Sequence, residues 1–115
     1  MSEQEFGPLK KDNVDALIEF LAPYVDGILA RIDVDEFTTV QLIDAMQTDP
    51  AAEAAYLETV RRWGEDEVSS KMVVHGQVIP TILRMSPRVE WAGFAYDEHD
   101  PYAVPAWWKL IGGEG

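Results

Sequence analysis

The chain changes from a helical to a β pattern within one short stretch, Ile79-Pro80-Thr81-Ile82-Leu83-Arg84-Met85-Ser86-Pro87-Arg88-Val89-Glu90-Trp91. The first part predicts a short amphipathic helix over about 79–85, because apolar residues recur at helical spacing and Pro80 is tolerated in a first turn. The Ser86-Pro87 pair then predicts a break. A strand is expected to begin directly after it.

Two aromatic-rich runs follow this break, over 89–96 and 103–111. Both have the composition of β-strands. Residues 97–102, between them, have turn composition. The two runs therefore predict a β-hairpin with a six- to seven-residue tip.

Upstream, an apolar stripe runs from Val14 to Ile32 at steps of three and four residues. It predicts a helix over 12–33 with Asp12 as its N-cap. Pro23 inside the stripe predicts either a kink or two shorter helices that meet at 22–24, and the unchanged phase of the stripe favours the kink. Residues 1–11 are polar and are expected to form a loose lead-in.

Clear start and stop signals mark the middle of the chain. An extended segment at Phe37-Thr38 precedes a helix expected over 40–47, capped by a threonine. Asp49-Pro50 predicts the start of the next helix, since Asp caps helices and Pro suits the first helical position, and Gly64 predicts its end. After a short acidic turn, a helical turn or two is expected to end near His75; Val73-Val74 would also suit a strand.

These elements together predict an α+β fold. Their order, ending in the helix at 79–85, the Ser86-Pro87 break and a hairpin that returns through Trp107-Trp108-Lys109-Leu110, resembles the winged helix-turn-helix domains of small archaeal and bacterial DNA-binding proteins. The resemblance covers residues 36–112, with 12–33 as an additional N-terminal helix and 113–115 as a tail. It implies that the helix at 79–85 enters the major groove and that the hairpin is a wing.

Charge is distributed unevenly over the 115 residues, whose 21 acidic and 9 basic residues give a net charge of −12. The window 68–96 has three basic residues and one acid, a net of +2, whereas the other 86 residues have six basic and twenty acidic residues, a net of −14. Binding to DNA requires neutralisation of phosphates by Lys and Arg, so this window is the predicted DNA surface. The same balance would also arise by chance in a window that is largely core, or in a surface that binds a partner protein.

The window supplies cations for phosphates and polar side chains for base edges. The candidate DNA-binding residues are Ser70, Lys71, Gln77, Thr81, Arg84 and Arg88. The acids Asp97, Glu98 and Asp100 at the hairpin tip argue against contact between the tip and phosphates.

A homodimer is expected, because one copy offers few phosphate contacts. The long stripe of the 12–33 helix is the predicted contact, and strand alternation requires Trp107 or Trp108 to face away from the core. The candidate dimer or partner contacts are Leu17, Leu21, Val25 and Trp107.

The sequence lacks the residues that several kinds of catalytic or metal site require. The chain has no cysteine, so a disulfide framework and a thiolate metal site are excluded. The Asp97–Asp100 cluster is interpreted as a solvated turn rather than a metal site, and His75 as a core or helix-end histidine rather than a base. No phosphate loop and no assembly of nucleophile and base can be found, so we expect no cofactor, no metal and no enzyme activity. No run is long and apolar enough for a membrane span, which favours a cytoplasmic protein.

The function expected from this sequence is DNA binding as a dimeric transcriptional regulator. An acidic composition with only four lysines is typical of proteins from salt-loving organisms, where salt screens self-repulsion, so a halophilic organism or its virus is the expected source. The alternative is an acidic protein-interaction module, such as a DNA-mimicking viral inhibitor, that covers a basic site on a partner protein.

Overall fold

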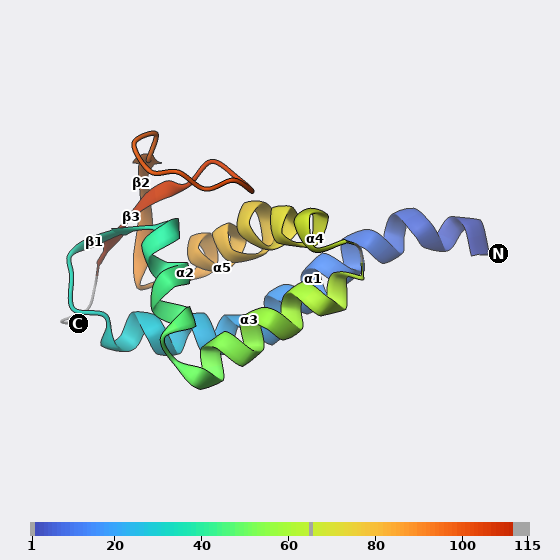
Figure 1. The fold of residues 1–115 in the computed structure, drawn as a ribbon, viewed down its shortest axis with the longest axis horizontal. Helices are drawn as coiled ribbons and strands as arrows, with labels where there is room; N and C mark the ends of the chain where they lie inside the picture. Colours follow the sequence, from blue (N-terminus) through green and yellow to red (C-terminus); the bar gives the residue numbers. More distant parts are fainter. Residues whose placement is uncertain (1, 65, 112–115) are drawn as a thin grey trace.

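The computed structural model describes residues 2–64 and 66–111, and it describes side chains from Val14 onward. The fold is α+β, as predicted (Figure 1). In chain order the elements are α1 (Ser2–Arg31), β1 (Glu36–Thr38), α2 (Thr39–Gln47), α3 (Pro50–Trp63), α4 (Glu67–Val73), the π-helical segment η1 (Val74–Val78), α5 (Ile79–Met85), β2 (Val89–Phe94) and β3 (Ala106–Leu110). The expected tail at 113–115 lies outside the described residues.

The local signals in the middle of the chain position α2 and α3 as predicted. The Thr38 hydroxyl accepts a hydrogen bond from the backbone N–H of Gln41, and the Gln41 side chain accepts one from the backbone N–H of Thr38, which completes a capping box. Asp49 caps α3 with Pro50 at its first position. Gly64 ends α3 with φ at 84°, a left-handed conformation that favours glycine.

Helix α1 differs from its predicted form. It begins at Ser2 rather than at Asp12, so the lead-in expected to be loose is helical. As the stripe favours, it runs through Pro23 as one helix rather than as two shorter helices. The apolar side chains of its stripe hold it against the rest of the fold, which outweighs the backbone hydrogen bond that Pro23 cannot donate.

The break expected near Gly76 is absent, because α4, η1 and α5 form one continuous helical run over 67–85. The N–H of Ile79 bonds to the carbonyl of Val74, five residues back, as in a π-helix. Pro80 explains the wider turn: it has no N–H, and its ring would clash with the carbonyl of Gly76 four residues earlier. The helix over 79–85 keeps its predicted bounds.

The hairpin is confirmed, but both strands are shorter than predicted and residues 95–105 connect them, so the expected six- to seven-residue tip is wrong. The hairpin extends into a three-stranded antiparallel sheet with the order β1-β3-β2. Phe37 and Trp91 both pair with Trp108, on opposite sides of β3. Trp108 is fully buried, and its indole N–H donates to the Thr39 hydroxyl at 2.9 Å. A register shift interrupts the β2–β3 pairing between Trp91 and Phe94, where Gly93 has φ at 115°. The sheet therefore closes one end of the helical layer, and β2 is an edge strand.

The predicted dimer stripe lies in the core of the single chain. Leu17, Leu21 and Val25 are all buried within it, with α1 packed against both α3 and α5 (Figure 1). These three side chains are therefore unavailable to a second copy, and the prediction that they form a dimer contact is wrong. Burial of such a stripe contributes about 1.5–3 kcal/mol for each large apolar side chain, which is why the fold retains it.

Candidate nucleic-acid interface

The outward side of α5 and of the turn before it presents three of the predicted DNA-binding residues. Gln77 and Arg84 are exposed and Thr81 is half-buried, at spacings of four and three residues that place them along one side of the helical run. The opposite side of α5 is in the core through Ile79, Ile82 and Leu83. No carboxylate of the described part of the chain forms an ion pair with Arg84. The Arg84 guanidinium is therefore available to bind an external anion.

The other three predicted DNA-binding residues are buried or paired with an acidic side chain. Ser70 is fully buried, so it does not reach a ligand, and its prediction is wrong because the helix turns it into the core. Lys71 is largely covered: its ammonium pairs with Glu67 at 2.8 Å and lies 5.5 Å from the centre of the Tyr102 ring. The hydrogen bond to the Glu67 carboxylate raises the pKa of Lys71.

Arg88 follows α5 and is exposed, but it has a partner. Its guanidinium Nε lies 3.2 Å from the Asp26 carboxylate of α1, and both side chains are about half exposed. Such surface pairs contribute at most about 1 kcal/mol and are screened by salt. A phosphate can therefore compete for Arg88 with little loss of stability.

An exposed aromatic cluster lies beside Arg84, and the predicted DNA-binding residues do not include it. Trp91, Phe94 and Tyr96 are 46%, 48% and 79% exposed. The Trp91 and Phe94 ring centres are 5.3 Å apart, and those of Phe94 and Tyr96 are 5.6 Å apart. Arg84, Val89, Glu90, Trp91 and Phe94 line one shared hollow of about 530 Å³. The position of β2 at the sheet edge leaves these rings uncovered.

The hairpin tip folds back onto the helical run instead of projecting as a free wing (Figure 1). Nδ1 of His75 lies 2.8 Å from Asp100 Oδ2, and Nε2 of the same ring lies 2.6 Å from the Tyr56 hydroxyl. The side chains of His75 and Asp100 are only 8% and 4% exposed. At the other end of the tip, the Thr38 hydroxyl donates to Glu98 at 3.2 Å. The prediction of a solvated tip is therefore wrong for Glu98 and Asp100, whereas Asp97 is exposed.

Tyr56, His75 and Asp100 are joined by hydrogen bonds in a largely buried cluster. Burial, followed by the negative charge of Asp100, raises the pKa of Tyr56, so its hydroxyl keeps its proton. That hydroxyl lies within hydrogen-bond distance of Nε2 of His75, and Nδ1 of the same ring lies within hydrogen-bond distance of Asp100. His75 is a core histidine, one of the predicted alternatives. The three side chains anchor the tip and are covered by protein.

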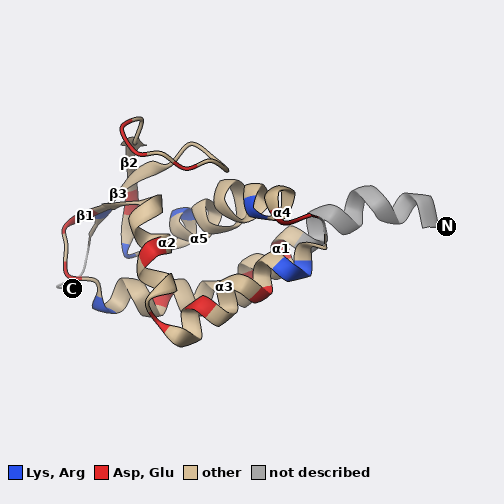
Figure 2. Cartoon of the chain, viewed as in Figure 1, with Lys and Arg blue, Asp and Glu red and all other residues tan. Residues whose placement is uncertain are grey.

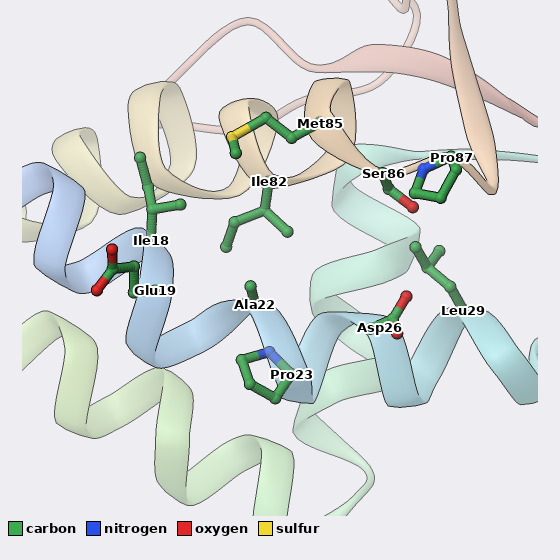
Figure 3. Close-up of a pocket in the computed structure, with 10 residues that line it drawn as sticks. All are labelled: Ile18, Glu19, Ala22, Pro23, Asp26, Leu29, Ile82, Met85, Ser86 and Pro87. Atoms are coloured by element: carbon green, nitrogen blue, oxygen red, sulfur yellow. The ribbon is translucent and has the colours of Figure 1, made fainter.

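A groove of about 430 Å³ separates α1 from α5 on the other side of the helical run (Figure 3). Ala22 of α1 and Ile82 of α5 face one another across it, and the carboxylates Glu19 and Asp26 lie along its α1 side. The lining is mainly apolar and its charged groups are acidic. This groove therefore suits an apolar or basic side chain rather than a phosphate.

Of the two neighbouring tryptophans in β3, Trp108 is in the core and Trp107 is half-buried. The alternation predicted for them is confirmed. Trp107 presents part of its ring to the surface, away from the cluster on β2.

Charge on the folded chain follows the distribution in the sequence (Figure 2). Acidic residues are spread over α1, α3 and the β2–β3 connection, whereas α5 carries only a basic one. Within the residues that the structure describes, no group of three or more His, Asp or Glu side chains is arranged to hold a metal ion. Among the described helices, none has both the length and the apolar character needed to cross a bilayer.

Comparisons with known proteins add no relative: neither a protein-family model, nor a curated protein, nor a solved structure matches this chain.

Proposed function

We propose that this chain is a winged helix-turn-helix protein that binds duplex DNA, acts as a transcriptional regulator and has no catalytic role. The order of elements supports the winged-helix interpretation, with β1 and the hairpin joined in one sheet beside α5. The observation that carries the proposal is the outward side of α5, where Arg84 lacks an ion-pair partner among the described residues and no acid interrupts residues 79–85. Gln77 and Thr81 add hydrogen-bonding groups on the same side.

The contact set implies weak, salt-sensitive binding. Arg84 is free to bind a phosphate, Arg88 becomes available when its surface pair with Asp26 opens, and Lys71 is mostly covered. Because each neutralised phosphate contributes about 0.9 to the slope of log K against log salt, one copy has a slope of about −2. Both DNA affinity and its salt dependence are therefore expected to be small for a monomer.

The experiment is a gel-shift titration with mixed genomic fragments at two salt concentrations, comparing the wild type with Arg84→Ala and Arg61→Ala. Arg61 is an exposed arginine on α3 that pairs with Glu58, so this control makes the same change in net charge away from α5. Arg84→Ala is expected to weaken binding and to reduce the salt slope by about 1, whereas Arg61→Ala leaves both unchanged. Absence of a shift at low salt, or equal effects of the two variants, would contradict the proposal.

A second candidate function is an acidic module that covers a basic site on a partner protein. The observation that favours it is the excess of acidic side chains on the described part of α1, which carries Asp15, Glu19 and Asp26 but one basic residue, Arg31. This function predicts that Arg84→Ala has no effect, while charge reversal at Glu19 and Asp26 abolishes the partner complex.

A further inference from the structure

The aromatic cluster on β2 is the most conspicuous exposed feature that duplex binding by α5 does not use. Trp91, Phe94 and Tyr96 form one continuous ring surface, and each is exposed by nearly half or more. Adjacent exposed aromatic rings of this size mark interaction sites, because solvation of apolar area is unfavourable unless a partner covers it.

Arg84 gives this ring surface a charge preference. Its guanidinium lines the same hollow as Trp91 and Phe94, and no described carboxylate is paired with it. Glu90, also in the lining, repels phosphate and accepts hydrogen bonds from exocyclic amino groups of bases. A bound strand is therefore oriented with its phosphate toward Arg84 and its base toward the rings and Glu90.

Unpaired bases fit this arrangement better than paired ones. In a duplex the faces of the bases are stacked on each other, so an aromatic side chain stacks only on a base that is unpaired. We infer that Trp91, Phe94 and Tyr96, together with Arg84, form a binding site for single-stranded DNA. The inference deepens the proposed function, on which it rests, by assigning the ring surface to unpaired bases and the side of α5 to the backbone.

The shape of β2 disfavours a second copy as the occupant. Pairing of two edge strands needs a regular row of backbone groups, whereas the register shift between Trp91 and Phe94 and the positive φ of Gly93 disturb this row. The rings remain accessible while the strand edge is a poor template for sheet extension.

The test uses fluorescence anisotropy of a labelled 15-nucleotide single strand of mixed sequence and of the same sequence as a duplex, at low salt. Trp91→Ala is expected to lower affinity for the single strand by about fivefold to 150-fold, because stacking contributes about 1–3 kcal/mol per base. Trp91→Phe is expected to restore most of this loss. Leu57→Ala, a truncation of a half-exposed apolar residue on α3, is the matched control and is expected to have no effect.

The other outcomes of this binding experiment separate the single-strand site from the proposed duplex binding. Binding of the duplex but not of the single strand overturns this inference and leaves the proposed function intact, whereas binding of neither overturns both. An unchanged affinity of Trp91→Ala for the single strand overturns the inference as well. If sedimentation shows that the wild type self-associates and Trp91→Ala does not, with no change in single-strand affinity, the rings form an interface between copies. The urea midpoints of all variants verify that each is folded.

Discussion

Replacement of His75 by alanine tests how the β2–β3 connection is held. His75 makes two hydrogen bonds in the core, one with the Tyr56 hydroxyl at 2.6 Å and one with the Asp100 carboxylate at 2.8 Å. The substitution removes both bonds and leaves a nearly buried carboxylate without its ring partner. Asp100 keeps the backbone N–H of Tyr102, which donates to its other oxygen at 2.9 Å.

The expected loss follows from these bonds. A hydrogen bond to a charged group contributes about 1.5–3 kcal/mol and a neutral one about 1 kcal/mol, so His75→Ala is expected to lower the free energy of unfolding by about 3 kcal/mol. Release of the connection into water limits the cost, because Asp100 can then be solvated. For a domain of this size, the melting temperature should fall by about 12 °C.

Urea denaturation measures the loss of stability, and hydrogen exchange measures the release of the β2–β3 connection. Tyr56→Phe removes only the Tyr56–His75 bond and should cost about 1 kcal/mol. His99→Ala, in the same connection but exposed, is the matched control and should change stability by less than about 0.5 kcal/mol. The amides of residues 96–104 should lose protection in His75→Ala only. If His75→Ala and His99→Ala have equal stability and equal protection, the anchoring role of His75 is refuted.

Three further perturbations test the fold. Thr38→Ala removes the cap of α2 and the bond to Glu98, so urea titration should show a free energy of unfolding lower by about 2 kcal/mol. An unchanged free energy of unfolding would contradict the capping box. Leu21→Ala should lower the free energy of unfolding by about 2–5 kcal/mol and leave the oligomeric state in sedimentation unchanged, because the side chain is fully buried within one chain. A change from dimer to monomer would show instead that Leu21 belongs to a dimer contact. Hydrogen bonds from Arg61 and Arg62 lower the pKa of Glu58 from 4.5 to about 2, so its contribution to stability is present above pH 4.5 and is lost as the pH falls toward 2. The urea midpoints of wild type and Glu58→Gln should therefore differ at neutral pH and converge near pH 2, and a constant difference across this range would contradict the assigned pairing.

Local signals account for the parts of the fold that the sequence predicts well. The capping box at Thr38, the Asp49-Pro50 start and the Gly64 stop each act within a few residues, and each appears at its expected place. The apolar stripe of α1 is equally local, but periodicity does not distinguish a helix buried by its own chain from one buried by a second copy. The stripe therefore correctly predicts that Leu21 packs against other apolar side chains, but the prediction that these belong to a second copy is wrong.

The missed features of the site depend on contacts between distant residues. His75 and Asp100 are 25 residues apart in sequence, and Tyr56 is a further 19 residues from His75, so no spacing rule joins them. The exposure of Trp91 depends on the strand order β1-β3-β2, which leaves β2 at the edge. Residue type alone favours the core for such a ring, and only the sheet order shows that it faces water.

Mapping the interface by NMR tests the central claim most directly. Titration of a 15N-labelled chain with duplex DNA at low salt should shift the amide signals of residues 77–88, including Gln77, Thr81 and Arg84, and the shifts should disappear at high salt. The signals of α3, which is distant from α5 in sequence and carries none of the predicted DNA-binding residues, should stay unchanged. Absence of shifts at low salt, or shifts confined to α1 and α3, would contradict the assignment of duplex DNA binding to α5.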